Sequence, residues 1–303
     1  MRKILITGAS GMIGEALCGA LSQKGYEINA LSRSRQKQSS STVQYYKWDI
    51  LKKEIDESAF SGVSSIIHLA GENIGGSRWT SGKKAKIITS RTDSIKLIYE
   101  KLKTNTSHQV ESIISSGAVG FYGDRGDELL TEDSKAGTGF LSEVCKTWEA
   151  SIYENSPFDS RKVIFRAGVV LNKLEGALPQ MEKMVSLGLG SPLGSGKQIM
   201  PWVHLKDVVS AFVFALENNK MDGVYNLTAP HFLTNKSFTK ALAKELKKPF
   251  WLPSVPSFIL KTMLGEQSHL LLDSTRVSSE KLQIEGFTFE FGDIKKALQN
   301  IYG

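Results

Sequence analysis

Residues 7–14, TGASGMIG, constrain this chain more than any other part of the sequence. They follow the short apolar run 3–7 and lead directly into an apolar pattern with helical spacing. Gly8 allows a tight turn, Gly11 lets the backbone approach a ligand closely, and Gly14 lets the helix pack against the strand. Such a helix directs N–H groups and the positive end of its dipole at an anion. The segment therefore predicts a strand, turn and helix that bind the two phosphates of a dinucleotide, and an ordinary strand-to-helix turn is the alternative.

Short apolar runs alternate with longer helical patterns through the first half of the chain. We expect strands at residues 3–7, 27–31, 43–47, 65–69, 112–116 and 162–166, and helices near residues 12–24, 83–103 and 141–155. In the second helix, Ile88, Ile95, Ile98 and Leu102 recur on one stripe. Strands that are apolar throughout are typical of a parallel sheet covered on both faces. This pattern predicts an α/β fold, a Rossmann-type doubly wound parallel sheet, in residues 1–166.

The pattern changes after Arg166, where residues 168–202 are irregular and rich in glycine. Helices are predicted near residues 206–218, 235–247 and 292–302. We expect residues 167–303 to form mainly a smaller C-terminal α+β substrate lobe, with the segment from Lys206 to Leu227 returning to the first domain. Residues 190–198, GSPLGSGKQ, are not a nucleotide-triphosphate loop, because Ser191 and Gln198 replace the required glycine and hydroxyl residues.

Composition excludes several classes of partner. The net charge of +7 comes from lysines scattered along helical patterns, which indicates solvated faces rather than a nucleic-acid surface. The sequence has no apolar stretch of about 18 residues, so we expect no membrane span. The apolar start is interrupted at Gly8, too early for a secretory signal. Cys18 and Cys145 lack metal-site or disulfide-framework spacing, which indicates reduced thiols, a cytoplasmic location and no metal site.

The end of the second predicted strand indicates which dinucleotide binds. Enzymes that use NAD commonly have an acidic residue here, which binds the ribose 2′-hydroxyl. This chain has Ser32 and Arg33 instead, and both can bind a 2′-phosphate. A hydrogen bond to a charged group contributes about 1.5 to 3 kcal/mol, so Arg33 favours NADP over NAD by roughly ten- to a hundredfold. The alternative is a surface arginine on a loop.

Several longer motifs resemble a known family. TGASGMIG, WDI at residues 48–50, HLAGE at 68–72, SSGAVGFYG at 115–123 and PWVHLKD at 201–207 resemble the extended short-chain dehydrogenase/reductases of the nucleotide-sugar epimerase group. The segments 74–91, 145–149, 274–282 and 286–289 resemble an atypical epimerase-family branch with a C-terminal domain of unknown function. The resemblance implies a domain that binds NADP(H), a small-molecule substrate held by the C-terminal lobe, and pairing into a homodimer. Members of this branch mostly lack an assigned substrate.

The resemblance also implies individual cofactor contacts. The expected residues are Gly8, Ser10, Gly11, Met12, Ile13 and Gly14 at the pyrophosphate, Arg33 at the 2′-phosphate, Asp49 near the adenine, and Leu69, Ala70, Gly71 and Ser90 along the cofactor. Purely structural alternatives stay open for three residues. Asp49 would only cap a following helix, and Arg91 would form a surface salt bridge. His68 would be a core histidine, and this is the interpretation that we prefer.

Catalysis is less well defined. Short-chain reductases use a Tyr with a Lys four residues later, and here Lys146 is preceded at that spacing by Ser142, a poor acid or base at neutral pH. Lys146 would hold the nicotinamide ribose or would be an exposed helix lysine. Ser115 or Ser116, at the end of a predicted strand, would polarise a carbonyl group. Glu72 is a candidate general acid if it is buried, or else only begins a loop.

The C-terminal part supplies candidate substrate residues. These are Trp202, His204 and Arg276, with Tyr122 from the first domain, and for Tyr122 packing is the alternative. Trp79 is expected to pack. Two function classes stay open. The first is an NADP-dependent oxidoreductase or epimerase-like enzyme that acts on a small polar alcohol or carbonyl compound, including nucleotide sugars. The second is a catalytically impaired NADPH-binding sensor or partner-binding protein.

Overall fold

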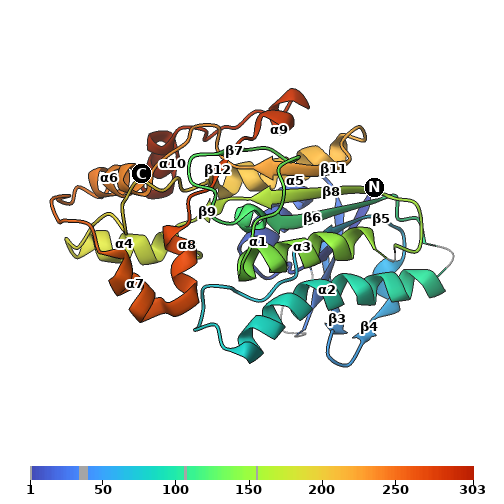
Figure 1. Cartoon of the computed structure of the whole chain (residues 1–303). Helices are drawn as coiled ribbons and strands as arrows, with labels where there is room; N and C mark the ends of the chain where they lie inside the picture. Colours follow the sequence, from blue (N-terminus) through green and yellow to red (C-terminus); the bar gives the residue numbers. More distant parts are fainter. Residues whose placement is uncertain (1, 34–39, 106–107, 155) are drawn as a thin grey trace.

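The computed structural model describes residues 2–33, 40–105, 108–154 and 156–303. Eight strands form one sheet in the order β11-β8-β6-β5-β1-β2-β3-β4 (Figure 1). All neighbours are parallel except β3 and β4. The strands are β1 Lys3–Thr7, β2 Glu27–Ser32, β3 Val43–Asp49, β4 Glu54–Ile55, β5 Val63–His68, β6 Ser112–Ala118, β8 Arg161–Ala167 and β11 Gly223–Leu227. The six predicted strands are present, and the predicted Rossmann-type fold is confirmed.

The strand order creates a crevice at the carboxyl ends of the central strands. From β1 the chain first adds β2 and β3 on one side, then crosses over to add β5, β6 and β8 on the other. The carboxyl ends of β1 and β5 therefore lie side by side at the point where the order reverses, which is where open α/β sheets bind ligands.

Helices cover both faces of the sheet. Helix α1 (Met12–Gln23) and helix α5 (Leu205–Glu217) contact each other on one face, and α2 (Ser81–Thr104) and α3 (Phe140–Tyr153) contact each other on the other face (Figure 1). Alternate side chains of each central strand pack on opposite faces of the sheet. In β1, Ile6 packs with α1 and α5, and Leu5 packs with α2.

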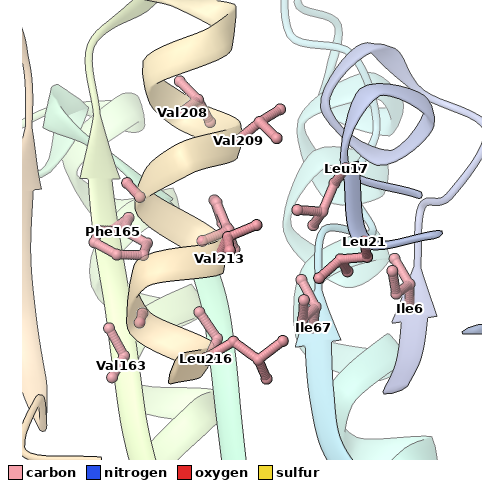
Figure 2. Close-up of a cluster of buried hydrophobic side chains, with 14 of the residues drawn as sticks. Ile6, Leu17, Leu21, Ile67, Val163, Phe165, Val208, Val209, Val213 and Leu216 are labelled. Atoms are coloured by element: carbon pink, nitrogen blue, oxygen red, sulfur yellow. The ribbon is translucent and has the colours of Figure 1, made fainter. Parts of the chain in front are cut away.

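Figure 2 shows part of the first layer, in which Leu17 and Leu21 of α1 lie near Ile67, and Val213 and Leu216 lie on the side of α5 that faces α1. The predicted stripe on α2 is correct at Ile95, Ile98 and Leu102. It is shifted at its start, where Ile87 is fully buried and Ile88 only partly.

The chain leaves the sheet after β8 and builds a second hydrophobic core. Trp202, Phe238, Leu242 and Leu298 are buried in this core. Its helices are α4 Leu178–Ser186, α6 Asn235–Glu245 and α10 Ile294–Tyr302. The other elements of this part are β9 Val169–Leu171, paired with β10 Trp202–His204; β12 Arg276–Val277, paired with β7 Leu129–Leu130; and α7 Ser257–Leu264, α8 His269–Leu272 and α9 Glu280–Ile284.

Further contacts, besides the pairing of β12 with β7, join this part to the sheet domain. Strand β11 pairs with β8, so α5 and β11 belong to the large sheet and its cover. The single-turn helix η3 (Gly265–Ser268) reaches the loop before α2, where Gln267 Nε2 donates to the carbonyl of Ser77 at 2.7 Å and Glu266 pairs with Lys84. The lobe boundary near residue 167 stays a prediction. Among the residues described, no helix has the length and apolar character needed to cross a bilayer.

Candidate functional site

The turn between β1 and α1 is built by glycines that touch backbone. Gly8 has φ +66°, and a Cβ there would lie 2.7 Å from the carbonyl oxygen of Leu69. A Cβ on Gly14 would lie 2.2 Å from the carbonyl oxygen of Gly8. At Gly11 the nearest atom to a Cβ would be 3.5 Å away, an ordinary contact. The fold therefore requires glycine at residues 8 and 14. At residue 11, glycine is needed only to leave the space above the turn free of a side chain.

The start of α1 is open to an external acceptor. Gly11 is its N-cap, with extended backbone, and provides no side-chain hydrogen bond to the first turn. Ser10 and Gly11 are exposed, and Met12 and Ile13 are partly exposed. The unsatisfied N–H groups of the first turn and the helix dipole thus face solvent at the crevice, a suitable place for a phosphate.

The loop after β5 forms the other side of the crevice. The N–H groups of Leu69 and Ala70 both donate to Thr7 Oγ1 at 3.0 Å, which ties the ends of β5 and β1 together. Gly71 follows and is exposed. Leu69, Ala70 and Gly71 are therefore held beside the glycine turn, as the cofactor interpretation requires.

The adenosine end of the predicted site has a basic character. Arg33, directly after β2, is exposed, and its charge contributes to lowering the pKa of Glu72, although the hydrogen bond from Lys83 contributes most. Asp49 ends β3, and its Oδ1 accepts from the N–H groups of Leu51 and Lys52 at 3.0 and 3.1 Å. These residues form a turn into β4, so the alternative that Asp49 caps a helix is wrong. Residues 34–39, which follow Arg33, lie outside the described residues.

Glu72 is not suited to act as a general acid. Its carboxylate pairs with Lys83 Nζ at 2.6 Å, and this hydrogen bond lowers its pKa against a smaller opposing effect of burial. The group is therefore ionised at neutral pH. Ser90 positions the same loop: its Oγ accepts from the N–H of Glu72 at 2.8 Å and donates to the carbonyl of Ile87 at 3.1 Å.

Arg91 lies beneath this loop instead of on the helix surface. Its Nη1 donates to the carbonyls of Glu72 at 3.1 Å and Ile87 at 2.8 Å, and its guanidinium carbon lies 4.9 Å from the ring centre of Trp148. Burial lowers its pKa. The surface salt bridge considered for Arg91 is not found among the described residues.

Ser115 belongs to a buried hydrogen-bond chain. It is 0% exposed, and its Oγ lies 3.2 Å from His68 Nδ1, while His68 Nε2 lies 2.7 Å from Ser94 Oγ. Burial, helped by the charge of Arg91, lowers the pKa of His68 to about 3. His68 is thus a neutral core histidine, as preferred, and Ser115 does not face the crevice. Ser116, on the opposite side of β6, is partly exposed and stays a candidate.

Helix α3 does not present Ser142 and Lys146 as a catalytic pair. Ser142 is buried and donates to the carbonyl of Phe121 at 2.7 Å. Trp148 faces Arg91 and α2, and Lys146, two residues away, lies about 200° around the helix from it. Lys146 is exposed on this side of the helix, and its place at the nicotinamide ribose stays a prediction. Cys145 faces the sheet instead, 3.5 Å from where a Cβ of Gly120 would lie.

The structure separates the four predicted substrate residues. Tyr122 is 0% exposed; its hydroxyl donates to Asn226 Oδ1 at 2.7 Å and accepts from Arg166 Nη1 at 2.9 Å. His204 is buried, caps α5 by accepting from the N–H of Lys206 at 3.1 Å, and packs on Phe291. Because both hydrogen bonds of the Tyr122 hydroxyl lie inside the fold, Tyr122 does not fit a substrate role. Nδ1 of His204 is used as a helix cap, whereas its buried Nε2 has no partner among the described residues, and its substrate role stays a prediction.

Trp202 and Arg276 are related through Phe232. Trp202 is buried in the second core but lines one small pocket together with Phe232 and Thr275. The guanidinium of Arg276 stacks on Phe232, 4.6 Å from its ring centre. Trp79 packs on Phe140 with ring centres 4.9 Å apart, as predicted. The part of the chain that the structure describes contains no cluster of three or more metal-ligating side chains.

Sequence reasoning missed the roles of Arg91, Cys145 and Arg166. Arg91 follows Ser90 on a helix whose buried stripe passes nearby, and this could have marked it as an inward residue. Arg166 was predicted only as the last residue of a strand. Its side chain is buried and forms two hydrogen bonds of 2.8 Å with Glu149.

Comparisons with known proteins agree with this arrangement. The model of the NAD dependent epimerase/dehydratase family matches residues 4–228, and that of a domain of unknown function (DUF1731) matches residues 255–301. The epimerase family protein YfhF of Bacillus subtilis is 32% identical over 299 residues, which cover 98% of this chain and 97% of that protein.

Two solved structures extend the comparison. The crystal structure of human epimerase family protein SDR39U1 (isoform 2) with NADPH has a TM-score of 0.87 and 29% identity, covering 99% of both chains. The nucleoside-diphosphate sugar epimerase from Corynebacterium glutamicum has a TM-score of 0.79 and 31% identity, covering 100% of this chain and 58% of that one. With the glycine turn, the crevice and the C-terminal part all matched, the chain belongs to the NAD dependent epimerase/dehydratase family.

Proposed function

We propose that this chain binds NADP(H) along the carboxyl edge of β1, β2 and β5, and uses it on a small polar alcohol or carbonyl compound. One observation carries the proposal. The uncapped first turn of α1 lies over a glycine turn packed against the carbonyl of Leu69, so its N–H groups are directed into the crevice. The NADPH bound to human SDR39U1 supports the choice of cofactor.

The residues present fit the dinucleotide. Backbone groups of Ser10, Gly11, Met12 and Ile13 would hold the pyrophosphate, and Arg33 the 2′-phosphate. Asp49 would bind near the adenine, and the loop from Leu69 to Gly71, fixed by Ser90, would line the middle of the cofactor. The absence of an acidic side chain at residues 32 and 33 supports NADP over NAD.

The chemistry depends on the cofactor and on few side chains. When bound, the nicotinamide gives or accepts a hydride at the carbon that bears the reacting oxygen. Ser116 would donate a hydrogen bond to that oxygen at the end of β6. Trp202 and Arg276 would contact a more distant part of the substrate, and the guanidinium suits a phosphate or carboxylate. A nucleotide sugar is the substrate class that the Corynebacterium glutamicum epimerase suggests.

A second candidate is a cofactor-binding protein without efficient turnover, acting as an NADPH sensor or a partner-binding module. One feature of α3 favours it: Ser142 occupies the position of the usual Tyr and is buried. Ser115 is buried as well, so Ser116 is the remaining hydroxyl of the predicted catalytic set.

Fluorescence titration with NADPH and NADH, followed by turnover assays on carbonyl compounds and nucleotide sugars, separates the candidates. Turnover that Ser116→Ala abolishes without changing the Kd for NADPH would support the enzyme. The matched control is Ser61→Ala, an exposed serine before the amino end of β5, which should leave both quantities unchanged. Tight NADPH binding without turnover would support the sensor. Failure to bind either reduced coenzyme would exclude both.

A further inference from the structure

One cation of the crevice has an uncommitted hydrogen-bonding edge. Nη1 of Arg91 is used by two carbonyls, those of Glu72 and Ile87. Nε is buried without a partner, and within the described ranges no hydrogen bond or ion pair involves Nη2. A buried guanidinium that loses its hydration without gaining a hydrogen-bond acceptor lowers the stability of the fold. An oxygen atom of a ligand would supply the missing acceptor at this edge.

Gly71 leaves the guanidinium group of Arg91 uncovered by a side chain from the loop. A Cβ on Gly71 would lie 3.0 Å from Cζ, 3.1 Å from Nη2 and 3.3 Å from Nε of Arg91. Because Cζ is the nearest of the three atoms, the exposed backbone of Gly71 lies over the face of the guanidinium, two residues after the Leu69 carbonyl that packs against Gly8. The Arg91 guanidinium is therefore held directly beneath the loop that borders the crevice.

The neighbours of Arg91 fix its orientation and keep it without a counter-ion. Its guanidinium stacks on Trp148, whose Nε1 is a second buried donor without a partner among the described residues. The nearest carboxylate in the loop, Glu72, is paired with Lys83. Cys145 and His68 lie within electrostatic range of Arg91; burial raises the pKa of the Cys145 thiol to about 12 and keeps His68 neutral. Neither supplies a negative charge at neutral pH.

We infer that Arg91 is the oxyanion-binding residue of the crevice, and that its Nε and Nη2 edge binds a phosphate, carboxylate or polarised carbonyl oxygen of the ligand. This inference rests on the proposed function. Two ligands could supply the oxygen: the nicotinamide half of the cofactor, or the substrate. A fork of two parallel donors matches such groups better than the point charge of a lysine.

The test compares Arg91→Gln and Arg91→Lys with Lys96→Gln, which removes an exposed charge from the same helix. Calorimetry measures the binding of NADPH and of adenosine 2′,5′-bisphosphate, which lacks the nicotinamide half, and of oxalate to the protein saturated with NADP⁺. Melting temperature and circular dichroism verify folding. If Arg91→Gln does not fold, Arg91→Lys gives the same comparison, because it keeps the charge and loses only the fork.

If the oxygen comes from the cofactor, Arg91→Gln weakens NADPH binding by about ten- to a hundredfold and leaves the bisphosphate unchanged. If it comes from the substrate, both nucleotides bind normally and oxalate binding is lost. Arg91→Lys should show a smaller loss in either case. Equal weakening of all ligands would identify Arg91 as a structural residue, and no weakening at all would remove its binding role; either result overturns the inference. Wild-type protein that binds no NADPH would refute the proposed function instead.

Discussion

The guanidinium of Arg166 and the carboxylate of Glu149 form a side-by-side pair in the interior, with Nε and Nη2 each 2.8 Å from a carboxylate oxygen. Burial alone would lower the pKa of Arg166, but the hydrogen bonds and charge of Glu149 raise it above its ordinary value. Arg166 also donates to the hydroxyl of Tyr122, which donates to Asn226. This network joins α3, β8, β11 and the single-turn helix η2 (Val119–Tyr122).

Removing one member of this pair should be costly. Glu149→Ala leaves a buried guanidinium without its counter-ion, and we expect the free energy of unfolding to fall by about 3–5 kcal/mol. Urea unfolding measures the loss. The double variant Glu149→Leu with Arg166→Met should be less destabilised than Glu149→Ala, because it leaves no buried charge. A single variant with wild-type stability would contradict the assignment.

Two glycines at the start of α1 and one in its middle should respond differently to alanine. Gly14→Ala would force a methyl group to 2.2 Å from the Gly8 carbonyl, so it should destabilise the fold and abolish cofactor binding. Gly11→Ala should keep the fold, because its Cβ has only an ordinary contact at 3.5 Å. It should weaken NADPH binding, because the added methyl group would occupy the space above the turn where the phosphates are proposed to lie.

The control is Gly19→Ala in the middle of the same helix, where a Cβ meets no atom within 4 Å. It should stabilise the protein by about 0.5–1 kcal/mol and leave binding unchanged. Unfolding curves and NADPH titrations of the three variants measure both effects. If Gly11→Ala bound NADPH as tightly as the wild type, the phosphates would not lie over that residue.

Arg33→Ala tests the nucleotide preference. Loss of a charge-assisted hydrogen bond to the 2′-phosphate should weaken NADPH binding by roughly ten- to a hundredfold and change NADH binding little. Arg2→Ala, an exposed arginine at the opposite edge of the sheet, is the matched control. Fluorescence titrations with both coenzymes measure the ratio, and equal losses would show that Arg33 does not contact the 2′-phosphate.

Two buried histidines should make stability depend on pH. Burial lowers the pKa of His68 to about 3, and burial together with the charge of Lys206 lowers that of His204 to about 4. The unfolded chain takes up protons at these residues below a pH of about 6.5, whereas the folded protein keeps both neutral. Stability is therefore fully present above that pH and is lost as the pH falls, by up to about 1.4 kcal/mol per unit for each histidine.

His204→Asn isolates one of these contributions, since asparagine can still cap α5. Urea unfolding between pH 7 and 4 should show a shallower loss of stability for this variant than for the wild type. Identical slopes would mean that His204 is not held neutral in the folded protein.

The sequence predicted the sheet well because each strand is an apolar run and each crossover helix is long. The strands β1, β2, β3, β5, β6 and β8 were placed within two residues at nearly every end. The short strands β9 and β10 could not be predicted, since their pairing joins residues about 30 positions apart and depends on the second core. Helix α7 was missed because most of its apolar residues are exposed, so it lacks a clear buried stripe.

The positions of the predicted site residues could be anticipated where backbone geometry decides and less well where helix rotation decides, and their contacts with a cofactor stay a prediction. Gly8, Gly14 and the loop from Leu69 to Gly71 were recognisable from spacing and residue type. Lys146 was placed by its four-residue distance from Ser142, a rule that ignores which side of α3 faces the crevice. The surface salt bridge that was left open for Arg91 is wrong for the same reason, since the burial of Arg91 depends on Trp148, 57 positions away.

The position of β11 also has a consequence for synthesis. Because residues 223–227 pair with β8, the sheet of a growing chain keeps an unsatisfied outer strand until more than two thirds of the protein has left the ribosome. An unpaired β edge of this kind invites intermolecular association. A gene fragment that stops shortly after residue 167 should accordingly give insoluble product, whereas one that runs past residue 227 would close this edge.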